Sequence, residues 1–236
     1  MPDLLLDESL ASDYELMLKR VEEGYPIQYI LGEWEFYGRS FYVEEGVLIP
    51  RPETELLVEQ VLRRLPEDKN IRGFEIGVGT GCISITLLLE RKKLLMFGND
   101  INLKALKLSK KNALRHGVYD RMFLFAGDAF SAIKKVLFDF IVSNPPYIPQ
   151  ARWEDLPKSV RLEGYRSLIG GKRGVEFYEL VSEDMDMYLS RDGFFAFEIG
   201  HDQGPEVRHI FERKGFKVEV IKDYAGQDRM VVGWRC

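Results

Sequence analysis

Residues 74–82 have the sequence Phe-Glu-Ile-Gly-Val-Gly-Thr-Gly-Cys, in which an apolar segment leads directly into a loop with glycine at every second position. Helical spacing begins at Cys82, so the loop joins a strand to a helix. Glycines at such a junction let the backbone approach a ligand closely, and the unpaired N–H groups at a helix start can bind polar or negative groups. Tight turns also use glycine for structural reasons alone, so this loop by itself is weak support for a ligand site.

Strands and helices alternate on the C-terminal side of this loop. Strand-like segments occur at residues 73–76, 94–99, 122–126, 138–143, 194–199, 216–221 and 229–234. Helical spacing occurs at residues 82–91, 102–116, 176–189 and 204–214, with Asn102 as an N-cap and Gly117 after a last turn. This alternation predicts an α/β fold with a seven-stranded, doubly wound, mostly parallel sheet and helices on both faces. Because residues 222–228 are too short for a helical crossover, we expect the last two strands to form an antiparallel hairpin at the sheet edge.

The first 50 residues have a different pattern. Helical spacing over residues 8–23 is followed by two aromatic and β-branched segments at residues 33–37 and 39–43. Pro52 suits the first turn of the next helix. We therefore expect residues 1–50 to form a short N-terminal helix plus a β-hairpin, and residues 51–236 to form the α/β domain.

The composition excludes several classes of protein. The chain has 236 residues, of which 45% are hydrophobic, too many for a disordered chain. Its 33 Lys and Arg against 38 Asp and Glu give a net charge of −5, which argues against a protein held on nucleic acid by phosphate contacts. No signal peptide or membrane-spanning stretch is recognisable, and the two cysteines form no zinc-site spacing. We expect a cytoplasmic protein without a metal site, a membrane anchor or stable nucleic-acid binding.

Acidic residues accompany the glycine loop at positions suited to a cofactor. Glu75 precedes the first glycine and can bind a positive charge directly or through water. Asp100 ends the second strand, where an acid accepts hydrogen bonds from ribose hydroxyls. A dinucleotide site would have its third glycine at Cys82, so the spacing favours an adenosyl cofactor without pyrophosphate. Asp128 follows the third strand, where it can accept a hydrogen bond from the adenine amino group or cap the next turn.

The most specific motif is Asn144-Pro145-Pro146-Tyr147, at the end of the fourth strand, where ligands bind in open α/β sheets. Two successive prolines fix the backbone and remove two N–H donors. The carbonyl groups of the Asn144 side chain and the Pro145 backbone can then both accept hydrogens from a planar –NH₂ group, and Tyr147 offers a face for stacking. Such a site selects a nitrogen nucleophile, so together with the adenosyl cofactor it predicts a nitrogen methyltransferase.

Several segments of the chain resemble one known family. They are Gly24-Tyr25-Pro26, Tyr29-Ile30-Leu31-Gly32, Glu35-Phe36-Tyr37-Gly38, Leu48-Ile49-Pro50-Arg51-Pro52-Glu53-Thr54-Glu55 and Asn144-Pro145-Pro146-Tyr147. On these motifs the sequence is similar to the PrmC/HemK family, the peptide chain release factor N5-glutamine methyltransferases, which use S-adenosylmethionine. The resemblance extends from Gly24 to the end of the chain and implies a Rossmann-like class I methyltransferase fold.

The resemblance also implies roles for individual residues. It assigns the cofactor, S-adenosylmethionine or its product S-adenosylhomocysteine, to Gly77, Val78, Gly79, Thr80, Gly81, Asp100, Asp128 and Ala129. We add Glu75 and Asn144 to these cofactor contacts. The expected catalytic and substrate-binding residues are Asn144, Pro145, Pro146 and Tyr147, which would hold the glutamine side chain of a Gly-Gly-Gln loop. The expected partner is therefore a release factor.

Three features depart from the family pattern. The family's Glu-Pro ahead of a glycine-rich segment at residues 170–175 is Glu163-Gly164 here, and Ala129 is small where some members have a bulky aromatic. Only about one helix precedes Gly24, whereas family members usually have a helical N-terminal domain. We therefore expect substrate recognition to depend on the β-hairpin and on the loop after Tyr147.

Other functions fit parts of the same pattern. A glutamine methyltransferase acting on a ribosomal protein shares the Asn-Pro-Pro-Tyr motif, as does an enzyme that methylates an exocyclic base amine of DNA or RNA. The acidic balance argues against nucleic acid, and the basic residues within 104–115 are those of a solvated helix face. A non-catalytic adaptor would need neither Asn144 nor an intact glycine loop.

Overall fold

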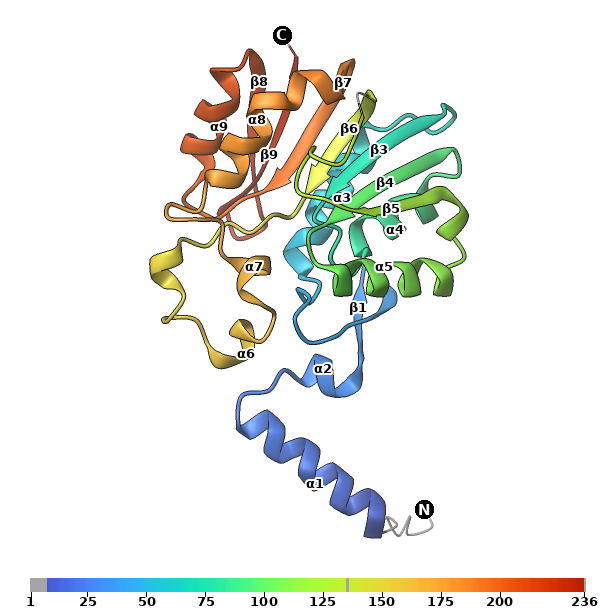
Figure 1. Ribbon diagram of the computed structural model, residues 1–236, viewed down its shortest axis with the longest axis vertical. Coiled ribbons are helices and arrows are strands. Elements are labelled where there is room, and N and C mark those ends of the chain that lie inside the picture. Colours follow the sequence, from blue (N-terminus) through green and yellow to red (C-terminus); the bar gives the residue numbers. More distant parts are fainter. Residues whose placement is uncertain (1–7, 135, 236) are drawn as a thin grey trace.

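The structure is a computed structural model that describes residues 8–134 and 136–235. The strands of its central sheet are β3 (Ile71–Ile76), β4 (Leu94–Asp100), β5 (Met122–Ala126), β6 (Phe138–Ser143), β7 (Leu189–Glu198), β8 (Phe216–Lys222) and β9 (Asp228–Arg235). They form one seven-stranded sheet in the order β5-β4-β3-β6-β7-β9-β8 (Figure 1). The strands from β5 to β7 pair in parallel, and β9 is antiparallel to both β7 and β8. The doubly wound sheet and its terminal hairpin are confirmed.

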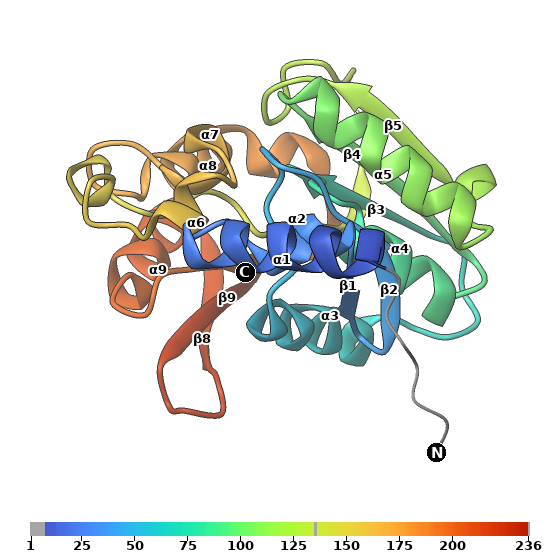
Figure 2. The same ribbon diagram turned by 90° about the horizontal axis from the view of Figure 1, so that it is seen from below.

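Helices cover both faces of this sheet (Figure 2). The helices of the described residues are α1 (Glu8–Glu22), α2 (Ile27–Leu31), α3 (Pro52–Arg64), α4 (Cys82–Glu90), α5 (Leu103–Arg115), α6 (Lys158–Arg161), α7 (Tyr165–Leu168), α8 (Glu176–Tyr188) and α9 (Gly204–Glu212). Two 3-10 turns, η1 (Tyr119–Arg121) and η2 (Gln150–Arg152), complete the elements. Side chains of α3 and α4 pack on one face, and those of α8 and α9 pack on the other.

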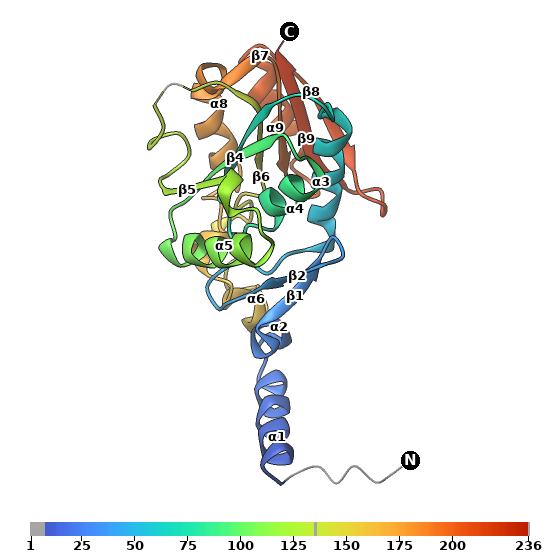
Figure 3. The ribbon, with the colours of Figure 1, turned by 90° about the vertical axis from the view of Figure 1, so that its right-hand side faces the viewer.

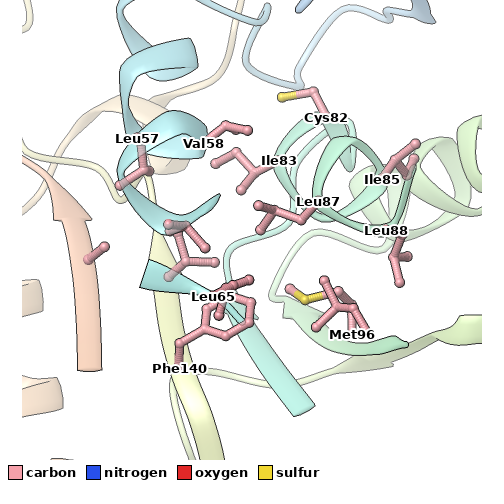
Figure 4. Close-up of a cluster of buried hydrophobic side chains, with 14 of the residues drawn as sticks. Leu57, Val58, Leu65, Cys82, Ile83, Ile85, Leu87, Leu88, Met96 and Phe140 are labelled. Carbon is pink, nitrogen blue, oxygen red and sulfur yellow. The ribbon is translucent and has the colours of Figure 1, made fainter. Parts of the chain in front are cut away.

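Figure 4 shows the core on the first face, where α3 and α4 meet the sheet. Leu57 of α3, Leu87 of α4 and Phe140 of β6 are completely buried there. Each such side chain contributes about 1.5–3 kcal/mol by leaving water. Phe36 and Phe41, which come from the N-terminal β-hairpin, belong to the same buried cluster, so the hairpin is packed into the core.

The core on the second face is dominated by aromatic side chains. Phe195 of β7 contacts Phe211 of α9, with ring centroids 4.3 Å apart, and Tyr178 of α8 is completely buried. The described residues between β5 and β6 contain no helix, and some of their side chains pack on this face. There Phe130 is buried and stacks on Tyr188 at 4.3 Å.

The N-terminal hairpin consists of β1 (Glu33–Phe36) and β2 (Arg39–Tyr42), which pair antiparallel as expected. Its turn places Tyr37 and Gly38 at φ +52° and +67°, the conformation of a tight two-residue hairpin turn. The Tyr37 N–H donates to Glu55 Oε1 of α3 at 2.7 Å, which ties the turn to the body. Helix α1 extends away from the body (Figure 3). The division of the chain at residue 50 stays a prediction.

Local signals in the sequence placed most element ends correctly. The Asn102 side chain accepts a hydrogen bond from the Lys104 N–H at 3.0 Å and caps α5, and Gly117 follows that helix at φ +67°. Other differences between the expected and the observed elements are larger. Strand β7 begins at Leu189 rather than at residue 194. The sequence pattern also did not predict α2, η1, or the elements η2, α6 and α7 within residues 150–168.

Candidate active site

A cavity lies at the carboxyl ends of β3, β4 and β6 and contains about 990 Å³ of empty space, part of it open to solvent. The sheet order reverses between β3 and β6, and ligands of open α/β folds bind at such a reversal. The Ser143 hydroxyl donates to Ile76 O at 2.7 Å and joins the ends of these two strands. The cavity therefore has the position of a small-molecule site.

The glycine loop forms one wall of this cavity. Gly77 and Gly79 line it and have φ values of +73° and +54°, which side chains disfavour. A Cβ on either glycine would meet no protein atom within 4 Å, so both backbones are open to a ligand. The N–H groups of Gly77 and Val78 each donate to Asn99 O at 2.9 Å, which holds the loop against the end of β4. Thr80 also lines the cavity.

Gly81 lies outside the lining of the cavity, unlike the loop residues before it. It has φ +82° and forms the N-cap of α4. A Cβ at this position would lie 2.5 Å from the Ser109 hydroxyl oxygen of α5. The structure therefore gives the third glycine a role in the close packing of α4 against α5.

Two predicted acids line the cavity in different environments. Asp100 accepts hydrogen bonds from the backbone N–H groups of Gly79 at 3.0 Å and Asn102 at 2.8 Å, and burial raises its pKa. Glu75 is buried and accepts hydrogen bonds from the N–H and the hydroxyl of Ser84. Burial raises the pKa of Glu75 to about 8, so a positively charged ligand nearby would favour its ionised form.

Asn99 is a cavity residue that the sequence analysis missed. Its side chain is completely buried, and Nδ2 donates to Ala129 O at 2.6 Å. This bond helps hold Ala129 at φ +43°, a rare conformation for a residue with a side chain. Within residues 8–134 and 136–235, Asn99 Oδ1 has no hydrogen-bond partner. Asp128, next to Ala129, is exposed at the rim of the cavity.

These residues fit an adenosyl cofactor. The Asp100 carboxylate can accept hydrogens from ribose hydroxyls, while the loop at Gly77 and Gly79 leaves room for close backbone contact. The unpartnered Asn99 Oδ1 is a buried acceptor, and such an atom is costly unless a ligand or water supplies a hydrogen. Glu75 lines the same cavity, and a cationic group bound near it would favour its negatively charged form.

The Asn-Pro-Pro-Tyr motif contributes three of its four residues to the same cavity. Asn144, Pro145 and Pro146 line the same cavity as the glycine loop, so the structure brings the two motifs together. Tyr147 does not line it. Its hydroxyl donates to Glu198 Oε1 at 3.3 Å, and burial together with the Glu198 charge raises the pKa of Tyr147. The stacking role of Tyr147 stays a prediction.

Thr54 and Glu198 are buried polar residues that were also missed. Asn144 Nδ2 donates to Thr54 Oγ1 at 3.0 Å, and Thr54 Oγ1 donates to Glu198 Oε2 at 2.7 Å. Burial raises the pKa of Glu198 to about 7. A signal for Glu198 was present, because it is an acid that ends the apolar strand Phe194-Phe195-Ala196-Phe197 at the carboxyl edge of the sheet.

The outer rim joins the N-terminal segment to the loop after Tyr147. Arg51, which lines the cavity, forms an ion pair with the buried Glu163 at 2.5 Å, and Glu163 Oε2 accepts the Ile49 N–H at 3.2 Å. Burial raises the pKa of Glu163 although Arg51 opposes this shift. Gly164 has φ +99°, which a proline ring cannot adopt, so the departure from Glu-Pro changes the backbone here. Arg166 of α7 also lines the cavity.

Two other features are absent from the part of the chain that the structure describes. No group of three or more His, Cys, Asp and Glu residues there could hold a metal ion. No helix in that part is long and apolar enough to cross a membrane.

The sheet order, the antiparallel last hairpin and the cavity at the reversal define a Rossmann-like class I methyltransferase. In agreement, the family model described as "Methyltransferase small domain" matches residues 52–156. A solved ribosomal protein L11 methylase from Lactobacillus delbrueckii subsp. bulgaricus superposes with a TM-score of 0.60 over 82% of this chain and 83% of that one. At 19% identity this likeness shows the fold alone.

Curated relatives narrow the class. A release factor glutamine methyltransferase from Aquifex aeolicus (strain VF5) is 53% identical over 230 residues, which are 98% of this chain and 82% of that protein. Another from Bacillus cereus is 41% identical over 239 residues, with coverages of 98% and 83%. The chain belongs to the release factor glutamine methyltransferase family.

Proposed function

We propose that this chain transfers a methyl group from S-adenosylmethionine to the side-chain amide nitrogen, N5, of the glutamine in the Gly-Gly-Gln motif of a peptide chain release factor. The observation that carries this proposal is the shared cavity. It is lined both by Gly77, Gly79 and Asp100 and by Asn144 and Pro145. A cofactor held by the first set and an amide held by the second set would therefore meet.

The chemistry requires activation of a weak nucleophile, because the lone pair of an amide nitrogen is delocalised into its carbonyl. S-adenosylmethionine, when bound, would supply a methyl group on a positively charged sulfur. Transfer would exchange its C–S bond for an N–C bond and leave neutral S-adenosylhomocysteine, and the methylated nitrogen would then lose one proton to water. The carbonyl oxygens of Asn144 and Pro145 accept the two amide hydrogens, which favours a pyramidal nitrogen and stabilises its developing positive charge. Positioning alone can supply roughly 7–11 kcal/mol of the barrier reduction.

The identity of the partner and of the cofactor belongs to this proposal. The charge balance of −5 and the family membership favour a protein substrate over nucleic acid. Because release factors act in translation, the proposal also includes a cytoplasmic location.

A substrate panel tests the proposal directly. The purified protein is incubated with methyl-labelled S-adenosylmethionine and with a release factor, a ribosomal protein or tRNA, each offered separately. We expect label on the release factor only, and none when its motif glutamine is replaced by alanine. The control is Asn144→Ala, which should still bind S-adenosylhomocysteine but transfer no methyl group. Label on the ribosomal protein or tRNA alone, or on none of the three, contradicts the proposal.

A further inference from the structure

We infer that Glu198 is a positioning residue for this reaction and that it acts through Thr54. Together they fix which end of the Asn144 amide faces the substrate, so that the site takes an –NH₂ group and rejects a carboxylate. The inference rests on the proposed function and deepens it, because it names the residues that select a glutamine over a glutamate.

Three side chains from separate parts of the chain form a line of hydrogen bonds. Asn144 follows β6, Thr54 lies in the first turn of α3, and Glu198 ends β7. The distances are 3.0 Å from Asn144 Nδ2 to Thr54 Oγ1 and 2.7 Å from Thr54 Oγ1 to Glu198 Oε2. Thr54 and Glu198 are only 2% and 1% exposed, so bulk water does not replace these bonds.

The direction of each bond follows from the donors and acceptors available. A threonine hydroxyl has one hydrogen, and an ionised carboxylate can only accept. Thr54 therefore gives its hydrogen to Glu198 and can only accept from Asn144. Asn144 must then turn its –NH₂ group towards Thr54, which leaves Oδ1 as the end of the amide available on the cavity side.

This orientation decides the chemistry of the substrate pocket. The two ends of an asparagine amide are similar in shape, so hydrogen bonding rather than packing chooses between them. With Oδ1 presented, Asn144 accepts a hydrogen from a glutamine side chain but meets only oxygen lone pairs on a glutamate. A site built to bind an N–H group can reject the analogue that lacks it by a factor of about 10⁴.

The segment that contains Glu198 also forms hydrogen bonds with Tyr147, the last residue of the Asn-Pro-Pro-Tyr motif. Glu198 Oε1 accepts the Tyr147 hydroxyl at 3.3 Å. Gln203, which is 7% exposed, donates from Nε2 to Tyr147 O at 2.9 Å and to Gly174 O at 3.1 Å. Glu198 and Gln203 therefore hold the Asn-Pro-Pro-Tyr motif in place through Tyr147. Neither of these two residues lines the cavity, so they act on the motif from outside it.

Protonation of Glu198 would reverse the donor and acceptor roles along these hydrogen bonds. A neutral carboxyl can donate to Thr54, which frees the Thr54 hydrogen for Asn144 Oδ1 and turns the Asn144 –NH₂ group to the substrate. Among the residues that the structure describes, the ionisable groups around Glu198 are Glu53 of α3, Tyr147 after β6, Tyr178 of α8 and Arg229 of β9. Burial outweighs the favourable charge of Arg229, and the pKa of Glu198 rises to about 7.

The first experiment measures substrate selection. Binding of a release factor with Gly-Gly-Gln and of its Gly-Gly-Glu variant is compared at pH 8 with S-adenosylhomocysteine present. We expect Thr54→Val to lower the preference for glutamine at least about tenfold, and Thr54→Ser to keep it within about threefold. The matched control is Thr86→Val, a buried threonine of α4 whose hydroxyl has no hydrogen-bond partner among the described residues. It should leave the preference unchanged.

The second experiment measures pH dependence, which a merely structural residue would not set. The wild-type preference for glutamine should appear as the pH rises through about 7, and Glu198→Gln should remove that step. An unchanged preference in Thr54→Val, or an unchanged step in Glu198→Gln, overturns the inference. A wild-type protein with no preference for glutamine at any pH would instead contradict the proposed function.

Discussion

The Asp100 carboxylate accepts a hydrogen bond from the Gly79 backbone N–H, with 3.0 Å between Oδ2 and N. Its other oxygen accepts the Asn102 N–H at 2.8 Å. One carboxylate therefore holds the glycine loop and the start of the α5 segment while it lines the cavity. Backbone N–H groups from two segments therefore fix the position of the Asp100 carboxylate before a ligand binds. A preorganised ligand-binding group is expected to be held in this way.

Replacement of Asp100 by alanine should weaken cofactor binding strongly. The change removes an acceptor for the ribose and also releases the Gly79 N–H, and each lost bond to a charged group costs about 1.5–3 kcal/mol. We expect the Kd for S-adenosylhomocysteine, measured by calorimetry, to rise at least about 30-fold. Asp128→Ala, at the exposed rim, is the comparison and should raise it less than about tenfold. Equal losses in the two variants would contradict the role given to Asp100.

Gly81→Ala should destabilise the fold by a packing effect. A side chain here is strained at φ +82°, and its Cβ would lie 2.5 Å from Ser109 Oγ. We expect the free energy of unfolding in urea to fall by about 2–3 kcal/mol. Ser109→Ala should be nearly neutral alone, because the Ser109 hydroxyl has no hydrogen-bond partner among the described residues.

A double-mutant cycle separates the two causes of this loss. Ser109→Ala removes the oxygen that a Cβ at position 81 would strike, so it should restore at least about 1 kcal/mol to Gly81→Ala. The backbone strain remains in both backgrounds. Strictly additive effects of the two changes would show that Ser109 does not limit the space at Gly81.

The elements coded by neighbouring residues were predictable from the sequence. Asn102 and Gly117 mark the ends of α5 through local hydrogen bonding and a left-handed turn, and both act as expected. The meeting of the glycine loop with Asn144 was also predictable, because the carboxyl ends of parallel strands share one edge of a sheet.

Features of the fold and of the site that depend on contacts between distant residues could not be predicted from local sequence signals. Glu198 owes its place to Thr54 and Tyr147, which are 144 and 51 positions away in the chain. The packing role of Gly81 depends on its contact with Ser109 of α5. The sequence does not show this contact, so it does not distinguish Gly81 from the glycines that line the cavity. Residues 150–168 contain short helices. Their apolar residues do not recur with helical spacing, so the sequence pattern could not predict these helices.

Recognition of the protein substrate can be tested on the loop after Tyr147. Arg166 is exposed and lines the cavity, so it is placed to contact a bound protein without supporting the core. We expect Arg166→Ala to raise KM for the release factor by about three- to tenfold through loss of a polar contact. The control is Arg191→Ala, an exposed arginine outside that lining, which should leave KM unchanged. If both variants behave like the wild type, this loop does not recognise the substrate.

The β-hairpin needs a more selective test, since its residues have two kinds of role. Phe36 is 1% exposed and belongs to the core, so its replacement by alanine should cost about 3–5 kcal/mol of stability and would obscure any effect on recognition. Trp34 is only partly buried. We expect Trp34→Ala to raise KM for the release factor while the affinity for S-adenosylhomocysteine stays the same. An unchanged KM would limit recognition to other surfaces.

The buried acids should make the protein less stable as the pH rises. Burial raises the pKa of Glu75 to about 8 and that of Glu198 to about 7, above the ordinary value of 4.5. Between pH 5 and these values the folded state binds more protons than the unfolded state, so the free energy of unfolding falls with pH. The slope is about 1.4 kcal/mol per pH unit for each such carboxyl, and the contribution is fully present only below pH 4.5.

Urea unfolding at several pH values from 5 to 8 measures this slope. Glu75→Gln and Glu198→Gln should each flatten it, whereas Glu67→Gln, at an exposed position, should not. Parallel curves for all four proteins would show that these carboxyls do not titrate as burial predicts. The expected result has a functional meaning: the ionised Glu198 that orients Asn144 forms near pH 7, where the loss of stability from this carboxyl is nearly complete, so the site keeps a charge that the fold alone would not favour.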